Sequence, residues 1–297
     1  MNATGSQDFR GKLLRNEPMA RHTSWRLGGP ADSYYVPADL DDLQVYLASL
    51  DAQTEILWVG LGSNLLVRDG GFRGQVIAPL GALKQIRLEP DGSVYAECGI
   101  PCSKLARFCQ KQGLGGGDFF AGIPGTVGGA LTMNAGAFGG ETWNQVERVV
   151  VINRQGEVTE RMPDEYKVSY RHVAFPAGEW FVAAYFRFAA RAEGEESNIR
   201  EMLQRRNETQ PIGQPSCGSV FKNPPGKHAA KLIEASGLKG HRHGTARVSD
   251  KHANFIISEA DTTASDVEAL IGLIRETVQQ QFDVRLETEV RIVGESA

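Results

Sequence analysis

The sequence predicts an α+β fold in two domains that follow a short lead-in. Its 297 residues are enough for one or two domains. Short apolar runs separated by Gly, Pro and Asp dominate the earlier part of the chain and are typical of strands. The polar stretch RAEGEES then interrupts this pattern, and longer helical periodicities follow it. We therefore expect a lead-in at 1–25, a larger domain at 26–190 with parts at about 26–80 and 81–190, and a second domain at 191–297.

The larger domain should consist mainly of strands. The expected elements are strands at 55–59, 76–80 and 94–98, a helix at about 101–112, a hairpin at 146–162 and a strand at 180–188. Each strand is a brief apolar run bounded by Gly, Pro or Asp. The helix has one apolar face and ends before Gly113. The hairpin would turn through residues 153–156, Asn-Arg-Gln-Gly.

The second domain should contain more helix. The expected elements are a polar helix that Pro211 and Pro215 end, a helix at about 228–236, a strand at about 253–258, a helix from Asp266 and a strand at 284–292. Ser265 and Glu268 predict a capping box at the start of the long helix. Strict alternation in the last segment predicts a half-buried strand. Its outward residues would be Arg285, Glu287, Glu289 and Arg291.

Charge and hydropathy argue against nucleic acid and membrane as partners. The net charge is −4, without any run of five or six like charges, whereas nucleic-acid-binding domains carry a clustered basic surface. No apolar stretch reaches the roughly 18 residues of a membrane span, and the start lacks the features of a signal peptide. We expect a cytoplasmic protein with a small-molecule ligand, acting as a monomer or a weak oligomer.

The sequence also predicts no metal site. Its four cysteines fit neither a disulfide framework nor a zinc ribbon; they are Cys98, Cys102, Cys109 and Cys217. Four histidines gather loosely in one region without an H-E-x-x-H motif; they are His228, His241, His243 and His252. Solvated or structural histidines and reduced thiols are therefore expected.

The segment 59–67, VGLGSNLLV, has the pattern of a phosphate-binding turn. After a strand, small residues can aim successive backbone N–H groups into one concavity, which binds pyrophosphate without cationic side chains. Ser63 and Asn64 could add side-chain donors. The segment is neither a P-loop nor a dinucleotide fingerprint, because it lacks the G-K-[ST] ending and residues 65–67 continue as a strand. A simple glycine-rich turn between two strands remains the alternative.

A second glycine-rich region follows about 60 residues later. Eleven glycines lie between residues 113 and 140, and apolar residues interrupt them throughout. This composition predicts a buried loop system whose backbone closely approaches a ligand. Its core is AGIPGTVGGA at 121–130, followed by MNAGA at 133–137. Two such loops in one chain indicate a long dinucleotide lying across both.

Together these motifs resemble a known flavoprotein fold. GLGSNLLVRDGGF followed by AGIPGTVGGALTMNAGAFG is similar to the FAD-binding fold of the vanillyl-alcohol-oxidase (PCMH) type and, within it, to the UDP-N-acetylenolpyruvoylglucosamine reductase family. The resemblance extends from RHTSWRLGG at 21–29 to EVR at 289–291. It implies FAD binding by the domain at 26–190 and substrate binding by the domain at 191–297. The implied cofactor-binding residues are Gly60, Leu61, Gly62, Ser63, Asn64, Leu65, Gly122, Ile123, Pro124, Gly125, Thr126, Gly128, Asn134, Ala135 and Gly136.

The resemblance also implies the cofactor chemistry. Many relatives attach FAD to a histidine or cysteine beside the first loop, but the corresponding VRDGGFRG contains neither residue, so FAD should be non-covalent. In the family, NADPH reduces FAD, and hydride then passes from flavin N5 to the methylene carbon of UDP-N-acetylglucosamine enolpyruvate. The product, UDP-N-acetylmuramate, is a peptidoglycan precursor.

Three residues of this sequence match the family's catalytic motifs. Arg171, in Ser-Tyr-Arg, would anchor the substrate carboxylate, since its planar fork suits that group. Ser219, in PSCGSVFKNP, would supply the proton, and Cys217 beside it would be structural. Glu289 would stabilise the enolic intermediate; periodicity does not separate it from Glu287, but the Glu-Val-Arg ending selects it. From their context alone, the three would be a surface arginine, a turn serine and a solvated carboxylate.

Further expectations concern the substrate. Lys222 and Asn223 could contact its diphosphate. Longer family members carry an extra segment between the arginine and the serine, with a tyrosine that closes over the substrate. This chain lacks that segment and resembles the shorter subclass. Two other functions stay open: an FAD-dependent alcohol or lactone oxidase or dehydrogenase on the same fold, and a nucleotide-binding module without catalysis.

Overall fold

The computed structural model describes residues 9–297 of the chain. Residues 1–8 of the predicted lead-in, which include much of the segment inspected for a signal peptide, lie outside the described part. Helices and strands are mixed along the rest of the chain, which confirms the predicted α+β class. Among the helices of residues 9–297, none combines the length and hydropathy that a membrane crossing requires.

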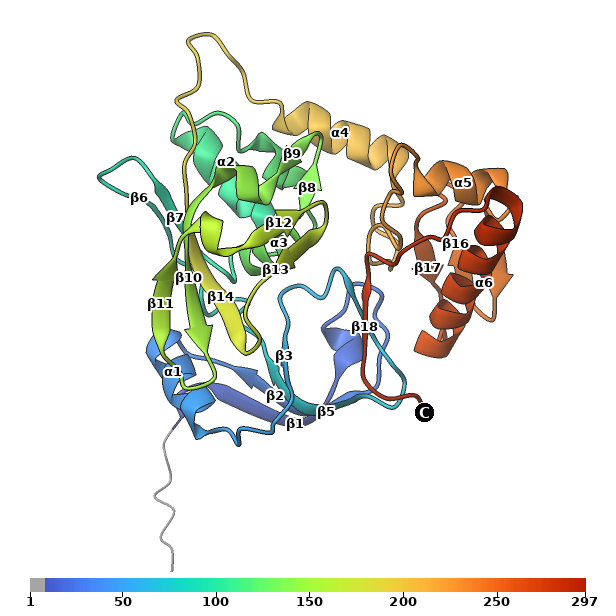
Figure 1. The fold of residues 1–297 in the computed structure, drawn as a ribbon, viewed down its shortest axis with the longest axis horizontal. Coiled ribbons are helices and arrows are strands. Elements are labelled where there is room, and N and C mark those ends of the chain that lie inside the picture. The colour runs from blue at the N-terminus through green and yellow to red at the C-terminus, as the bar shows by residue number, and fades with distance from the viewer. Residues whose placement is uncertain (1–8) are drawn as a thin grey trace, which may run out of the picture.

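A four-stranded mixed sheet forms the lower part of the molecule in Figure 1. In spatial order its strands are β1 (Lys12–Pro18), β2 (Pro30–Val36), β5 (Phe72–Ile77) and β3 (Ile56–Trp58). The pair β1–β2 is antiparallel, whereas β5 runs parallel to both β2 and β3. The strand predicted at 76–80 is the end of β5, which stops at Ile77 because the following Pro79 lacks a backbone donor for the ladder.

A five-stranded antiparallel sheet lies above the first one. In spatial order its strands are β11 (Val158–Arg161), β10 (Val146–Asn153), β14 (Glu179–Phe186), β7 (Val94–Glu97) and β6 (Ile86–Leu88). These strands confirm the predicted hairpin at 146–162 and the predicted strands near 94 and 180. Helix α1 (Leu40–Ser49) packs into an apolar core that both sheets share, which holds the two sheets together.

The glycine-rich region, which packs against the five-stranded sheet, is more helical than predicted. It contains η2 (Asp118–Gly122) and α3 (Val127–Met133), after the correctly predicted α2 (Cys102–Lys111). Glycines disfavour helices, so α3 is absent from the sequence prediction of loops. Thr126 caps α3 by accepting a bond from the Gly129 N–H. Gly128 is required by packing, because a Cβ there would lie 2.8 Å from the Cys98 Cβ.

The remaining elements are short. They are the hairpins β8 (Gly136–Ala137) with β9 (Gly140–Glu141) and β12 (Lys167–Ser169) with β13 (His172–Ala174), and the 3₁₀ turns η1 (Met19–Arg21), η3 (Thr142–Gln145) and η4 (Pro163–Glu165). Both hairpins lie next to α3 in Figure 1. They bring residues 134–136 and Arg171 close together, as described below.

The C-terminal part of the chain has its own apolar core. Its elements are α4 (Ile199–Thr209), α5 (Ala229–Ala235), β15 (Arg242–His243), β16 (Ala246–Val248), β17 (Ile256–Ser258) and α6 (Ala264–Phe282). The core includes three residues from the other part of the chain: Trp25, Leu27 and Leu66. The Trp25 indole N–H donates to the Ile256 carbonyl at 2.7 Å. These contacts fix the C-terminal part against the first glycine turn.

The predicted cap of α6 is wrong by two residues. Thr263, and not Ser265, is the N-cap; its hydroxyl accepts from the Asp266 N–H at 3.0 Å, and the Asp266 carboxylate accepts from the Thr263 N–H. The predicted capping residue Glu268 instead forms an ion pair with Arg68 at 2.8 Å. Two overlapping capping patterns exist in this sequence, and tertiary contacts select the earlier one.

The prediction for the last segment is also partly wrong. The regular strand is β18 (Arg291–Val293), which pairs in parallel with β4 (Leu65–Val67). Residues 284–290 cross between the two parts of the molecule (Figure 1), and the outward side chains of this segment differ in exposure. Glu287 is exposed, with 77% of its side chain accessible, but Glu289 retains only 15%. Glu289 therefore points inward, contrary to the alternation.

Candidate active site

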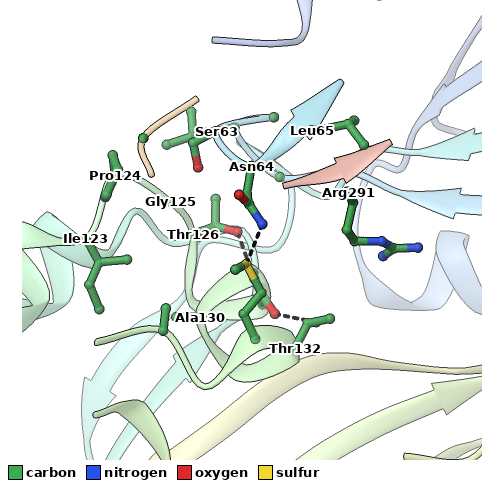
Figure 2. Close-up of a pocket in the computed structure, with 18 of the residues that line it drawn as sticks. Ser63, Asn64, Leu65, Ile123, Pro124, Gly125, Thr126, Ala130, Thr132 and Arg291 are labelled. Atoms are coloured by element: carbon green, nitrogen blue, oxygen red, sulfur yellow. Dashed lines mark hydrogen bonds between the residues drawn. The ribbon is translucent and has the colours of Figure 1, made fainter. Parts of the chain in front are cut away.

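A cavity of about 580 Å³ lies where both glycine-rich regions meet the C-terminal part of the chain. Its lining comes from residues within 55–65, 122–138, 154–181, 206–219 and from Phe255, Glu289 and Arg291. Figure 2 shows Ser63 and Asn64 of the first turn beside Gly125 and Thr126 of the second loop. All predicted cofactor-binding residues line this cavity except Asn134.

The first turn presents a row of unused donors to the cavity. The backbone N–H groups of residues 60–64 have no hydrogen-bond partner within residues 9–297. Gly62 has φ +59°, and a Cβ there would lie 2.0 Å from the His22 carbonyl oxygen. Gly62 is buried, Leu61 is exposed and the other three residues lie between these extremes, so the donors are free to contact a ligand, and a turn with successive free N–H groups suits an anionic one.

The second loop contacts the first turn directly. A Cβ on Gly60 would lie 2.5 Å from the Thr126 hydroxyl oxygen, and one on Gly125 would lie 3.5 Å from the Ser63 hydroxyl oxygen. Only glycine at position 60 lets the two loops approach this closely. Both loops therefore form one wall of the cavity.

Asn134 has a structural position beside the cavity. It ends α3 in the left-handed conformation, with φ +47°. Its side-chain amide donates to the Glu141 carboxylate and the Ser169 carbonyl, and its oxygen accepts from the Trp143 N–H. The side chain thus joins the two small hairpins, and its predicted contact with the cofactor stays a prediction.

Arg171 occupies the turn of the β12–β13 hairpin with φ +53°. Its Nη2 donates to the Gly136 carbonyl at 2.8 Å and its Nη1 to the Asn134 carbonyl at 3.3 Å. Its Nε lies 3.3 Å from Glu289 Oε1. These contacts hold the guanidinium in one orientation at the cavity wall, with 17% of the side chain accessible. An arginine fixed in this way is preorganised for an anionic substrate group.

Glu289 connects three motifs that are distant in the sequence. Its backbone N–H donates to the Val220 carbonyl at 2.8 Å, and its carbonyl accepts from the Asn64 side chain at 2.9 Å. Burial raises the pKa of the Glu289 carboxyl above its usual value, and the charges of Arg171 and Lys222 partly offset this. A carboxyl group whose pKa is shifted by burial and by charged neighbours inside a cavity is a candidate functional group.

Ser219 lines the cavity on a rigid segment. The Val220 N–H donates to the Asn254 backbone carbonyl at 2.9 Å, and the Phe221 N–H donates to the Asn254 side-chain oxygen at 3.0 Å. The Asn254 amide donates back to the Phe221 carbonyl at 2.8 Å. Sequence reasoning missed Asn254; its only signal was a polar residue within the apolar run ANFII. The structure thus brings Arg171, Ser219 and Glu289 to one cavity.

Comparison with known proteins identifies the family. Curated proteins named UDP-N-acetylenolpyruvoylglucosamine reductase match along nearly the whole chain. The protein from Alkalilimnicola ehrlichii is 55% identical over 287 residues, covering 96% of each chain. The protein from Methylococcus capsulatus is 56% identical over 290 residues, covering 97% of this chain and 95% of the relative. This chain belongs to the UDP-N-acetylenolpyruvoylglucosamine reductase family.

Two family models and a solved structure agree with this assignment. The model of the UDP-N-acetylenolpyruvoylglucosamine reductase C-terminal domain matches residues 210–293, and that of an FAD binding domain matches residues 31–161. The crystal structure of the UDP-N-acetylenolpyruvylglucosamine reductase from Thermus caldophilus superposes with a TM-score of 0.81 at 31% identity. It covers 95% of this chain and 98% of its own.

The cavity residues fit FAD, the cofactor of the reductase family. The matched FAD binding domain includes both the turn with unpaired N–H groups and the loop that faces it. These donors suit a diphosphate, with Ser63 and Thr126 hydroxyls beside them. Trp58 and Trp180 also line the cavity, and their rings stack with centroids 5.6 Å apart. Sequence reasoning missed this aromatic surface. Sequence reasoning also missed the cavity arginines Arg154 and Arg206.

Lys222 and Asn223 do not line the cavity. The Lys222 ammonium lies 3.8 Å from the Glu287 carboxylate, and the Asn223 side-chain oxygen accepts from the N–H of Ala229, the first residue of α5. Their contact with a substrate diphosphate therefore stays a prediction. Within residues 9–297, no group of three or more His, Cys, Asp or Glu side chains is placed to hold a metal ion.

All four thiols should be unreactive in the native protein. They are buried, and Cys217 lines the cavity with 3% exposure. Burial raises the pKa of the Cys217 thiol well above its usual value, and the Glu289 charge adds to this. Since the thiolate is the reactive form, a disulfide reagent at pH 8 should label no cysteine within minutes, but all four in guanidinium. Rapid labelling of Cys217 with loss of activity would contradict its structural role.

Proposed function

We propose that this chain reduces UDP-N-acetylglucosamine enolpyruvate to UDP-N-acetylmuramate with NADPH, a step in the synthesis of peptidoglycan. The observation that carries the proposal is the contact network centred on Glu289. It joins Asn64 of the FAD turn, Arg171 and the Ser219 segment at one cavity. A fold that only bound a nucleotide would have no need for these three groups together.

We propose the following division of labour among the residues. When bound, FAD supplies the hydride that it has taken from NADPH. Arg171 holds the enolpyruvyl carboxylate, and its fixed orientation stabilises negative charge as it develops there. The Ser219 hydroxyl gives its proton to the carbon that does not receive hydride. Glu289 orients Arg171 and supports the enolic intermediate.

Stopped-flow absorbance separates this function from an oxidase or dehydrogenase on the same fold. NADPH should bleach the flavin absorbance rapidly without oxygen. UDP-N-acetylglucosamine enolpyruvate should then restore that absorbance under the same anaerobic conditions. Reoxidation by oxygen alone, with no response to the nucleotide sugar, would support an oxidase and refute the proposed reductase.

The remaining expectations from the sequence belong to the same proposal. We place the enzyme in the cytoplasm, as a monomer or weak oligomer that does not bind nucleic acid. The N-terminal part to about residue 190 would bind FAD, and the part from 191 would bind the substrate. Light scattering after size exclusion at micromolar concentration tests the oligomeric state, and a stable dimer there would contradict it.

FAD should be held without a covalent bond. No histidine lines the cavity, and Cys217 is its single cysteine among the residues that the structure describes. The raised pKa of that thiol suppresses its nucleophilic form. Acid precipitation of the purified protein should therefore release all yellow colour into the supernatant. Flavin absorbance that stays with the pellet would show a covalent link.

A further inference from the structure

Helix α4 connects the two parts of the molecule. At its start, the Asn198 N–H donates to the Asp118 carboxylate at 2.8 Å, which ties it to η2 and the second glycine loop. Near its end, the Asn207 carbonyl accepts from the Lys251 ammonium of the C-terminal part. Figure 1 shows α4 extending from the cofactor side toward α5. The last turn of α4 therefore has a fixed position relative to both parts.

Arg206 lies on that last turn and lines the cavity. Its Nε donates to the Gln210 side-chain oxygen at 3.1 Å. Within residues 9–297, no carboxylate forms an ion pair with Arg206, and neither Nη atom has a hydrogen-bond partner. Burial lowers the pKa of the Arg206 guanidinium, because its charge is partly removed from water. An arginine in this state lacks the counter-ion that normally accompanies burial.

The position of Arg206 points to a ligand as that counter-ion. Two other half-buried arginines line the cavity: Arg171 already has Glu289 as its partner, and the Nη2 of Arg154 donates to the Thr54 carbonyl at 2.8 Å. Residues 211–216 connect α4 directly to the Ser219 segment, so Arg206 and Ser219 line the cavity on one short stretch of chain. Lys222 and Asn223 do not line the cavity, which leaves the phosphates of a nucleotide sugar without a cation from that motif.

We propose that Arg206, oriented by Gln210, binds the diphosphate of the nucleotide-sugar substrate and thereby positions the enolpyruvyl group beside Ser219. This inference rests on the proposed function. A guanidinium with both Nη groups free can form paired hydrogen bonds with phosphate oxygens. The phosphates of NADPH have the same chemistry, and the experiment below separates the two ligands.

The test compares Arg206→Gln with Arg205→Gln in the FAD-loaded enzyme. Arg205 is the neighbouring, exposed arginine on the same helix and does not line the cavity, so it controls for net charge. We expect Arg206→Gln to raise the KM for the nucleotide sugar at least about tenfold, in keeping with a lost charged hydrogen bond. The Kd for NADPH in the anaerobic half-reaction, the flavin content and the flavin spectrum should stay unchanged. Arg205→Gln should leave every value unchanged.

A binding measurement without turnover makes the assignment independent of catalysis. Calorimetric titration should show that uridine diphosphate binds the wild-type holoenzyme more tightly than uridine does, and that Arg206→Gln removes this difference. An equal difference in both proteins would overturn the proposal, as would a rise confined to the Kd for NADPH. If the wild-type enzyme failed to respond to the enolpyruvyl substrate but still bound uridine diphosphate through Arg206, the proposed reaction would fail and the phosphate site would stand.

Discussion

Replacing Ser219 with alanine should leave the reduction of the flavin by NADPH unchanged and slow substrate-driven reoxidation about a hundredfold or more. We propose this hydroxyl as the proton source, and loss of one positioned acid typically has an effect of about this size. The main-chain clamp from Asn254 does not involve the Ser219 side chain, so the fold should be kept. Anaerobic stopped-flow measures the two half-reactions separately.

Ser216→Ala is the matched control for this variant. Ser216 lies on the same loop, but its hydroxyl donates to the Gln214 carbonyl and it does not line the cavity. Its two half-reactions should match those of the wild type. Normal reoxidation in Ser219→Ala would leave that residue without a catalytic role. Equal losses in both serine variants would instead indicate a general disturbance of the loop.

Replacing Arg171 with alanine should slow substrate-driven reoxidation by about 10² to 10³, the range found when one preorganised donor to a developing oxyanion is removed. Two effects act together. The proposed anchor of the substrate carboxylate is lost, and Glu289 loses the charge that partly offsets its burial, so the pKa of Glu289 should rise further. Reduction by NADPH should continue, because the unpaired donors of the FAD turn are untouched.

Arg171→Lys and Lys167→Ala complete this experiment. Lysine keeps the charge but cannot reproduce the planar fork that contacts Gly136, Asn134 and Glu289, so it should recover only a small part of the rate. Lys167 is exposed on the same hairpin, and its removal should have no effect. A rate for Arg171→Ala within a few-fold of the wild type would exclude Arg171 as the carboxylate anchor.

Much of the fold could be predicted because its signals are local. Helical spacing locates α2 and α6, and two apolar runs about a four-residue turn locate the β10–β11 hairpin. Helix α3 could not be predicted, because its two glycines disfavour a helix, and the need for one of them, Gly128, comes from its contact with the distant Cys98. The cap of α6 failed for a similar reason: the contact between Arg68 and Glu268 depends on residues 200 positions apart.

The same distinction between local signals and distant contacts applies to the candidate site. The sequence by itself determined the two glycine-rich loops, the motifs around Arg171 and Ser219, and thereby the family, since each motif is a short contiguous pattern. Only the tertiary structure decided that Glu289 enters the cavity while Glu287 faces solvent, and that Arg206 lies there too. Alternation assumes one covered face and one open face. Arg285 and Glu287 follow this pattern and are exposed, but at Glu289 the hairpin that carries Arg171 covers the outer face, so a contact with a distant segment, and not the local period, sets the direction of that side chain.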